Sequence, residues 1–139
     1  MNILTIDFET FYSRDFSLTK LTTEEYVRSD SFQVIGVSVK ENDNEAKWFS
    51  GTHEEILDFL SSYEWSNSFA LAHNAMFDSA ILSWRFNIFP MAWLDTLSMA
   101  RATDGLEVGN SLAKLAVRYD LGRKGTEVIR SEEHTSELQ

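Results

Sequence analysis

The chain has 139 residues, of which 43% are hydrophobic and 24% charged, the proportions of one water-soluble globular domain. Its formal net charge of −10 excludes a protein that holds nucleic acid through clustered Lys and Arg, but not one that meets phosphates through bound cations. The absence of cysteine excludes a disulfide framework and a thiolate zinc site, and it favours a cytoplasmic protein. No apolar run approaches the roughly 20 residues that span a bilayer, so no membrane association is expected.

The first half of the chain predicts three strands and one short helix. Residues 2–9 alternate in polarity and predict a strand. Residues 11–31 are polar and mixed, which predicts a loop with a short helix near 23–26. Residues 32–40 are rich in β-branched side chains and predict a second strand. After a turn, the chain returns as far as Phe49 to complete a hairpin.

The second half predicts helices and strands in alternation. Thr52 and Glu55 have the Ser/Thr-x-x-Glu spacing of a capping box, so a helix is expected to follow them. Apolar spacing and cap residues place the later elements: a strand at 69–72, a helix at 76–86, a strand at 91–94, a helix capped by Asp95, and a last helix that begins at Asn110-Ser111. This order predicts an α/β fold with a mixed sheet, in which the first strands pair antiparallel and the later ones pair parallel through right-handed crossovers.

The spacing of apolar residues also predicts which face of the 76–86 helix points into the core. Phe77, Ala80, Ile81 and Trp84 recur at helical intervals and are expected to share the buried face. The four tryptophans of the chain are scattered, so they are interpreted as packing or rim residues and not as a stacking platform.

Carboxylates occur at two notable places in this order. Asp7 and Glu9 are two residues apart on a strand, so their side chains project from the same face. Two such carboxylates repel each other, and a hard cation removes that cost, although a lone pair of this kind is more often a solvated strand end. Asp78 falls in the first turn of a helix, where the helix dipole favours negative charge. Its alternative interpretation is ordinary helix-start chemistry with Asn74 as the cap.

Taken together, the two groups of carboxylates favour a functional interpretation over a structural one. DFET at residues 7–10, followed roughly 65 residues later by HNAMFD at 73–78, resembles the first two motifs of the DEDD superfamily of 3′→5′ exonucleases. The chain is most similar to the proofreading domain of phage-type family A DNA polymerases, and the resemblance extends over residues 1–129. It includes the LDTLSMAR segment at 94–101 and the later LGRKG turn at 121–125.

The resemblance implies a ribonuclease-H-like mixed sheet of three antiparallel and two parallel strands with flanking helices. It implies that Asp7, Glu9 and Asp78 are catalytic and bind two divalent cations, Mg²⁺ or Mn²⁺. Asp7 would bridge the two ions, Glu9 would bind the ion that activates the attacking water, and Asp78 would help to hold the ion near the leaving oxygen.

The same resemblance implies how substrate is held. Thr10 and Phe11 would contact the terminal nucleotide through backbone N–H groups and base stacking, and His73 and Asn74 would orient the substrate or Asp78. The substrate would be a single-stranded DNA 3′ end, shortened by one nucleoside monophosphate at a time. The chain would be a monomeric proofreading region, with a polymerase domain on the same full-length chain, in the cytoplasm of a bacterium or a phage-infected host.

The chain departs from the family pattern in its third motif, a Tyr or His followed four residues later by the fourth metal-binding Asp. Tyr119 is followed at that distance by Arg123, so residues 1–129 are interpreted as a C-terminally truncated, partial domain with impaired activity. Residues 130–139 match the translation of a sequencing adapter and are excluded from the fold as a non-native tail. Two alternatives stay open: an inactive folded fragment that binds metal or nucleic acid weakly, and an RNA-trimming exonuclease of the same superfamily.

Overall fold

A computed structural model describes residues 1–122 and contains one mixed five-stranded sheet. Predictions for the turn near Gly125 and for the tail at 130–139 lie outside the described residues. Strand order is β3-β2-β1-β4-β5, with β2 antiparallel to both β1 and β3, and β4 parallel to both β1 and β5. The predicted combination of three antiparallel and two parallel strands is therefore confirmed. The strands are β1 (Asn2–Thr10), β2 (Val34–Glu41), β3 (Lys47–Phe49), β4 (Ser68–Ala72) and β5 (Ala92–Asp95).

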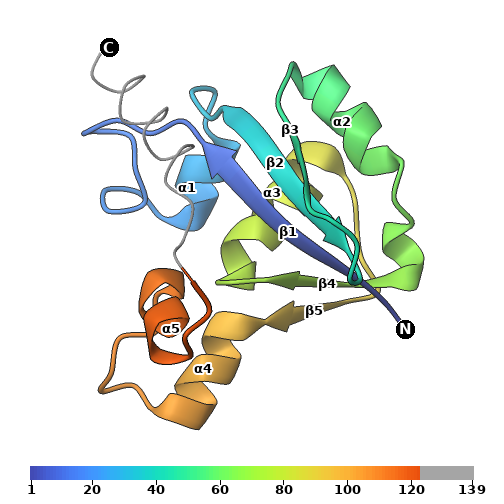
Figure 1. The fold of residues 1–139 in the computed structure, drawn as a ribbon. Coiled ribbons are helices and arrows are strands. Elements are labelled where there is room, and N and C mark those ends of the chain that lie inside the picture. Colours follow the sequence, from blue (N-terminus) through green and yellow to red (C-terminus); the bar gives the residue numbers. More distant parts are fainter. Residues whose placement is uncertain (123–139) are drawn as a thin grey trace.

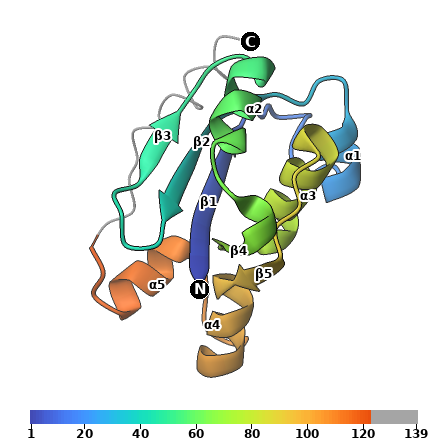
Figure 2. The ribbon, with the colours of Figure 1, turned by 90° about the vertical axis from the view of Figure 1, so that its right-hand side faces the viewer.

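Five α-helices and one 3₁₀ turn, at Trp65–Asn67, accompany the sheet in the described part of the chain. Figures 1 and 2 show α1, α2 and α3 on one side of the sheet, while α4 and α5 follow the carboxyl end of β5. No helix within residues 1–122 is both long and apolar enough to cross a bilayer. The helices are α1 (Thr23–Arg28), α2 (His53–Ser61), α3 (Ala75–Phe86), α4 (Thr96–Asp104) and α5 (Leu112–Arg118).

The hydrophobic core lies between the sheet and the first three helices. Side chains of β1 alternate, so that Leu4, Ile6 and Phe8 are buried in the core while Asp7 is exposed on the other face. Phe8 stacks on Phe86 of α3, with ring centroids 5.8 Å apart. One face of β1 therefore anchors the strand, and the opposite face presents its acids.

Cap residues set the helix boundaries where the sequence predicts them. Thr52 and Glu55 form the predicted capping box, and Asp95 accepts a hydrogen bond at the start of α4. A second box, formed by Thr22 and Glu25, starts α1 and was not predicted from the sequence. These polar contacts satisfy the first N–H groups of each helix, which have no partner within the helix.

The predicted inner face of α3 is wrong at one residue. Ala80 and Ile81 are buried and Phe77 is half-buried, but Trp84 is 42% exposed, with the guanidinium of Arg28 4.5 Å from its ring centroid. The helix is rotated so that Asp78 points into the protein. The buried face of α3 therefore includes the polar side chain of Asp78, which the spacing of apolar residues did not predict to be buried.

Candidate active site

A gap in the sheet between β1 and β4 receives Asp78. The parallel pairing of the two strands ends where Thr5 lies opposite Leu71, whereas β1 continues to pair with β2 as far as Thr10. The last residues of β1 thus have no strand on their β4 side. Oδ1 of Asp78, in the first turn of α3, accepts a hydrogen bond from the Phe8 N–H across this gap, at 3.1 Å. The carboxylate takes the place of the missing strand partner.

Burial and neighbouring charge both act on this carboxylate. Asp78 is 3% exposed, and the pKa of its carboxyl group is raised well above the ordinary value. Burial is the main cause; the Phe8 N–H opposes it, while the negative charges of Asp7 and, more weakly, Glu9 raise the pKa further. Asp7 and Glu9 therefore both act electrostatically on Asp78, and a cation held among the three acids would relieve this repulsion.

Asp7 and Glu9 occupy the face of β1 that turns away from the core, Asp7 exposed and Glu9 half-buried. Carboxylate oxygens are the ligands that Mg²⁺ and Mn²⁺ prefer, so the donor chemistry of the three acids fits such an ion. Within residues 1–122, however, no three acidic or histidine side chains are close enough to enclose a metal ion. The acids lie within electrostatic reach of one another without forming a finished coordination shell.

Thr10 and Phe11 are placed differently from the substrate contacts expected of them. The Thr10 side chain follows the inward alternation of β1, is 8% exposed, and hydrogen-bonds to the Tyr26 hydroxyl at 2.9 Å. Since that hydroxyl donates to the Phe11 carbonyl, the Thr10 hydroxyl is the donor in its own bond. The Phe11 N–H already donates to the Gln33 carbonyl at 2.9 Å. The expected backbone contact of Phe11 is therefore not available, and stacking by its half-buried ring stays a prediction.

His73 acts as a brace in this arrangement. Its Nε2 lies 2.8 Å from the Asn110 carbonyl, which can only accept, so Nε2–H is the donor. Its Nδ1 lies 2.9 Å from the Thr96 hydroxyl. Both ring nitrogens have partners within the chain, and the expected role of His73 in orienting the substrate or Asp78 stays a prediction. The ring ties the end of β4 to the segment before α5.

Asn74 precedes α3 but does not cap it with its side chain. Asn74 is the N-cap residue of α3, as predicted, but its backbone is left-handed, with φ 66° and ψ 63°, and its side chain makes no capping hydrogen bond. Its N–H donates to Oδ1 of Asp95 at 2.9 Å. The exposed Asn74 side chain stays a predicted substrate contact.

Asp95 joins the two helix starts on which the site depends. The Leu97 N–H also donates to its Oδ1, at 3.0 Å, and the Ser98 hydroxyl donates to its Oδ2, at 3.1 Å. Burial raises the pKa of Asp95, but these bonds and those from the Asn74 and Ala75 N–H groups outweigh it and leave the pKa lowered. The sequence predicted only the cap of α4. The carboxyl ends of parallel strands lie at a common edge of the sheet. This rule could have predicted that Asp95, at the end of β5, lies near Asn74, which follows β4.

Comparison with known proteins gives the class of fold. No family model and no curated protein matches the chain. Among solved structures, Brucella melitensis NrnC matches with a TM-score of 0.64 and 14% identity, over 88% of this chain and 54% of NrnC. NrnC with bound Mg²⁺ gives 0.62 and 16%, over 90% and 56%, and NrnC bound to pGG gives 0.63 and 15%, over 88% and 54%. The likeness shows an α/β fold of the ribonuclease-H-like class. The chain spans about half the length of the NrnC chains it matches.

Proposed function

We propose that this chain carries the acidic centre of a metal-dependent 3′→5′ exonuclease, which releases nucleoside monophosphates from the 3′ end of a single strand. The observation that carries the proposal is the buried Asp78 carboxylate, which is held by the Phe8 N–H within electrostatic reach of Asp7 and Glu9. The fold shared with NrnC, whose structures include one with Mg²⁺ and one with pGG, supports both a divalent ion and a nucleic-acid ligand.

In this proposal Asp7, Glu9 and Asp78 hold the divalent cations, Mg²⁺ or Mn²⁺. When bound, such ions stabilise the charge that develops on the entering and leaving oxygens of a phosphoryl transfer. The chain's own contribution is to place the ligands. The Phe8 N–H fixes one oxygen of Asp78, and the first turn of α3 favours its negative charge. The core behind Phe8 keeps this part of β1 from shifting.

The finer form of the proposal concerns substrate and context. The resemblance in the DFET and HNAMFD segments favours DNA proofreading by a monomer, with a polymerase domain on the same full-length chain, in the cytoplasm. The pGG bound by NrnC favours short oligonucleotides as a second substrate class to be tested alongside DNA. Contacts to the 2′-OH distinguish RNA from DNA, and comparing the two substrates measures this directly.

The test uses the chain with 5′-labelled single-stranded DNA, RNA of the same sequence, and pGG, each with Mg²⁺ or Mn²⁺. Slow stepwise release of mononucleotides from the 3′ end is expected, since the chain departs from the third motif of the family, and Asp78→Asn should lower its rate by about 10²-fold or more. Asp58→Asn is the matched control, because it makes the same chemical change on the exposed side of α2. Equal rates for wild type and Asp78→Asn would overturn the proposal.

The inactive alternative predicts a different pair of results. If the chain is a folded metal-binding module, it binds Mn²⁺ in a calorimetric titration and Asp78→Asn abolishes that binding, yet none of the substrates is cleaved. Turnover that depends on Asp78 excludes this alternative. Titration and turnover together therefore separate a working enzyme from a module that retains only the acids.

A further inference from the structure

A pocket of about 500 Å³ lies beside the candidate site, where β4 and β5 both end. Asn74 lines it from the start of α3, Leu97 and Arg101 line it from α4, and Leu106 and Val108 line it from the segment between α4 and α5. Pockets at the carboxyl ends of parallel strands are a common place for ligands in α/β folds, and this volume is within the usual range for small ligands.

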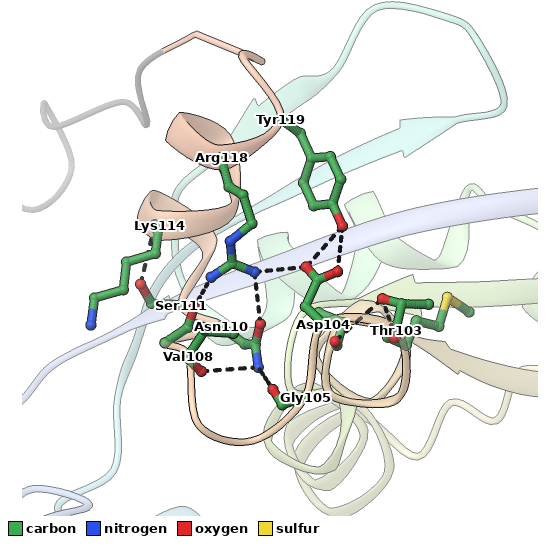
Figure 3. Close-up of polar contacts among 12 residues, drawn as sticks. Thr103, Asp104, Gly105, Val108, Asn110, Ser111, Lys114, Arg118 and Tyr119 are labelled. Carbon is green, nitrogen blue, oxygen red and sulfur yellow. Dashed lines mark hydrogen bonds and ion pairs between the residues drawn. The ribbon is translucent and has the colours of Figure 1, made fainter.

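Arg101 gives the pocket a cation that the fold does not use. Within residues 1–122 its guanidinium makes neither a hydrogen bond nor an ion pair, and the residue is exposed. The neighbouring Arg118 is engaged instead: it contacts Asp104 at 2.6 Å, Asn110 Oδ1 at 3.1 Å and the Gly109 carbonyl (Figure 3). In a chain with a net charge of −10, an unpaired guanidinium at a pocket is a ready partner for a phosphate.

Apolar side chains also line the pocket. Leu106 is 79% exposed and Val108 is 45% exposed, while Leu97 is half-buried. Exposed apolar side chains facing a pocket gain free energy when a flat, apolar surface covers them. A nucleobase has such a surface, and in a nucleotide it lies within reach of a phosphate.

The segment that carries Leu106 and Val108 is held in place. The Asn110 side chain donates to the Gly105 carbonyl at 2.9 Å and to the Val108 carbonyl at 3.3 Å (Figure 3). His73 donates to the Asn110 carbonyl, so the segment is joined to the end of β4. A wall ordered before binding does not lose that conformational entropy when the ligand arrives.

We propose that this pocket is a second nucleotide subsite, in which Arg101 binds a phosphate of the single strand and Leu97, Leu106 and Val108 cover one base. The inference rests on the proposed function, since it takes the ligand to be the nucleotide next to the one that is removed. It adds a substrate-binding role for Arg101, a residue that lies outside the acidic motifs at 7–10 and 73–78.

Binding is measured by fluorescence anisotropy with a 5′-labelled single-stranded DNA pentanucleotide and, by competition, with pGG. Arg101→Ala should weaken binding about tenfold and lower the slope of log Kd against log salt by about 0.7, the value for one lost phosphate contact on a single strand. Arg101→Lys should recover part of the affinity. Leu106→Ala should weaken binding severalfold without changing the salt slope, because it removes only apolar contact.

Lys47→Ala is the matched control, because it removes one positive charge from an exposed position on β3. Equal affinity and salt slope in Arg101→Ala and Lys47→Ala would overturn the subsite, as would the absence of any oligonucleotide binding. Arg101-dependent binding without cleavage would support the subsite and contradict the proposed exonuclease activity. Cleavage with KM unchanged in Arg101→Ala would support the proposed exonuclease activity and contradict the subsite. Mn²⁺ titration should be the same in wild type and Arg101→Ala.

Discussion

Replacing Asp78 by Asn should stabilise the metal-free protein at neutral pH and abolish its response to divalent metal. The amide oxygen can still accept the Phe8 N–H, a 3.1 Å bond in the wild type, so the contact across the gap between β1 and β4 is kept. The substitution removes a negative charge from a position that is 3% exposed. Burial, followed by the charges of Asp7 and Glu9, raises the pKa of this carboxyl group, so its ionised form opposes folding.

The direction of the pH dependence follows from this pKa. Because the folded pKa lies above the unfolded one, the folded state binds more protons between the two values, and the free energy of unfolding falls as pH rises through that window. Below the ordinary pKa of Asp, near pH 4, the penalty is absent. A rise of one pKa unit corresponds to about 1.4 kcal/mol, and 1 kcal/mol shifts Tm by roughly 4 °C in a domain of this size. The Tm advantage of Asp78→Asn should thus be several degrees at pH 7 and shrink toward acid pH.

Thermal unfolding followed by circular dichroism tests both parts. With EDTA, Asp78→Asn should melt above the wild type at pH 7; with Mg²⁺ at about 100 times its Kd, the wild type should gain about 2.7 kcal/mol and Asp78→Asn should gain nothing. The exposed Asp58→Asn should behave as wild type in both conditions. An Asp78→Asn protein that melts below the wild type in EDTA would refute the reasoning, because the carboxylate would then be a net stabilising group.

Three further predictions concern the frame around the site. Thr52→Ala removes the acceptor for the Glu55 N–H, 3.2 Å away, and should lower the free energy of unfolding by about 1 kcal/mol in a urea titration; an unchanged midpoint would contradict the role of the cap. In Gly36→Ala the new Cβ would lie 2.4 Å from the Trp48 ring, so a loss of about 1–3 kcal/mol is expected, and adding Trp48→Ala should restore part of it in a double-mutant cycle. Hydrogen bonds from Tyr119 and Arg118 lower the pKa of Asp104, so its stabilising contribution is complete above the unfolded pKa and is lost as pH falls through the folded pKa. Acid unfolding of wild type and Asp104→Asn should therefore differ less below about pH 4 than at neutral pH, and a difference that does not depend on pH would count against this.

Local sequence signals were enough to place most elements. A cap depends on residues three apart, so the Thr52–Glu55 box, the Asp95 cap and the Ser111 cap could all be found without the fold. The antiparallel pairing of the early strands and the parallel pairing of the later ones followed from the alternation of elements along the chain. These are properties of short segments, and the structure confirms them.

Contacts between residues far apart in the chain determine the features that local sequence patterns did not predict. The length of β1 depends on β2, which pairs with it as far as Thr10, one residue beyond the predicted end of the strand. The Thr10 side chain faces inward because that alternation continues. The hydrogen-bond partners of His73 are 23 and 37 residues away in the chain, a separation that no local pattern reveals.

The position of the candidate site follows from the change of strand direction at the centre of the sheet. On one side of β1, β2 pairs antiparallel along nearly its whole length; on the other, β4 arrives through a crossover and its pairing stops at Leu71. The resulting gap exposes a backbone N–H that must find an acceptor, and the helix that follows β4 supplies one from its first turn. Asp78 is thus held by backbone geometry, so changes to the outward-facing side chains of β1 should leave it in place. The position of Asp78 therefore does not depend on whether its neighbour Asp7 is an acid. Asp7→Asn should alter metal affinity without displacing α3.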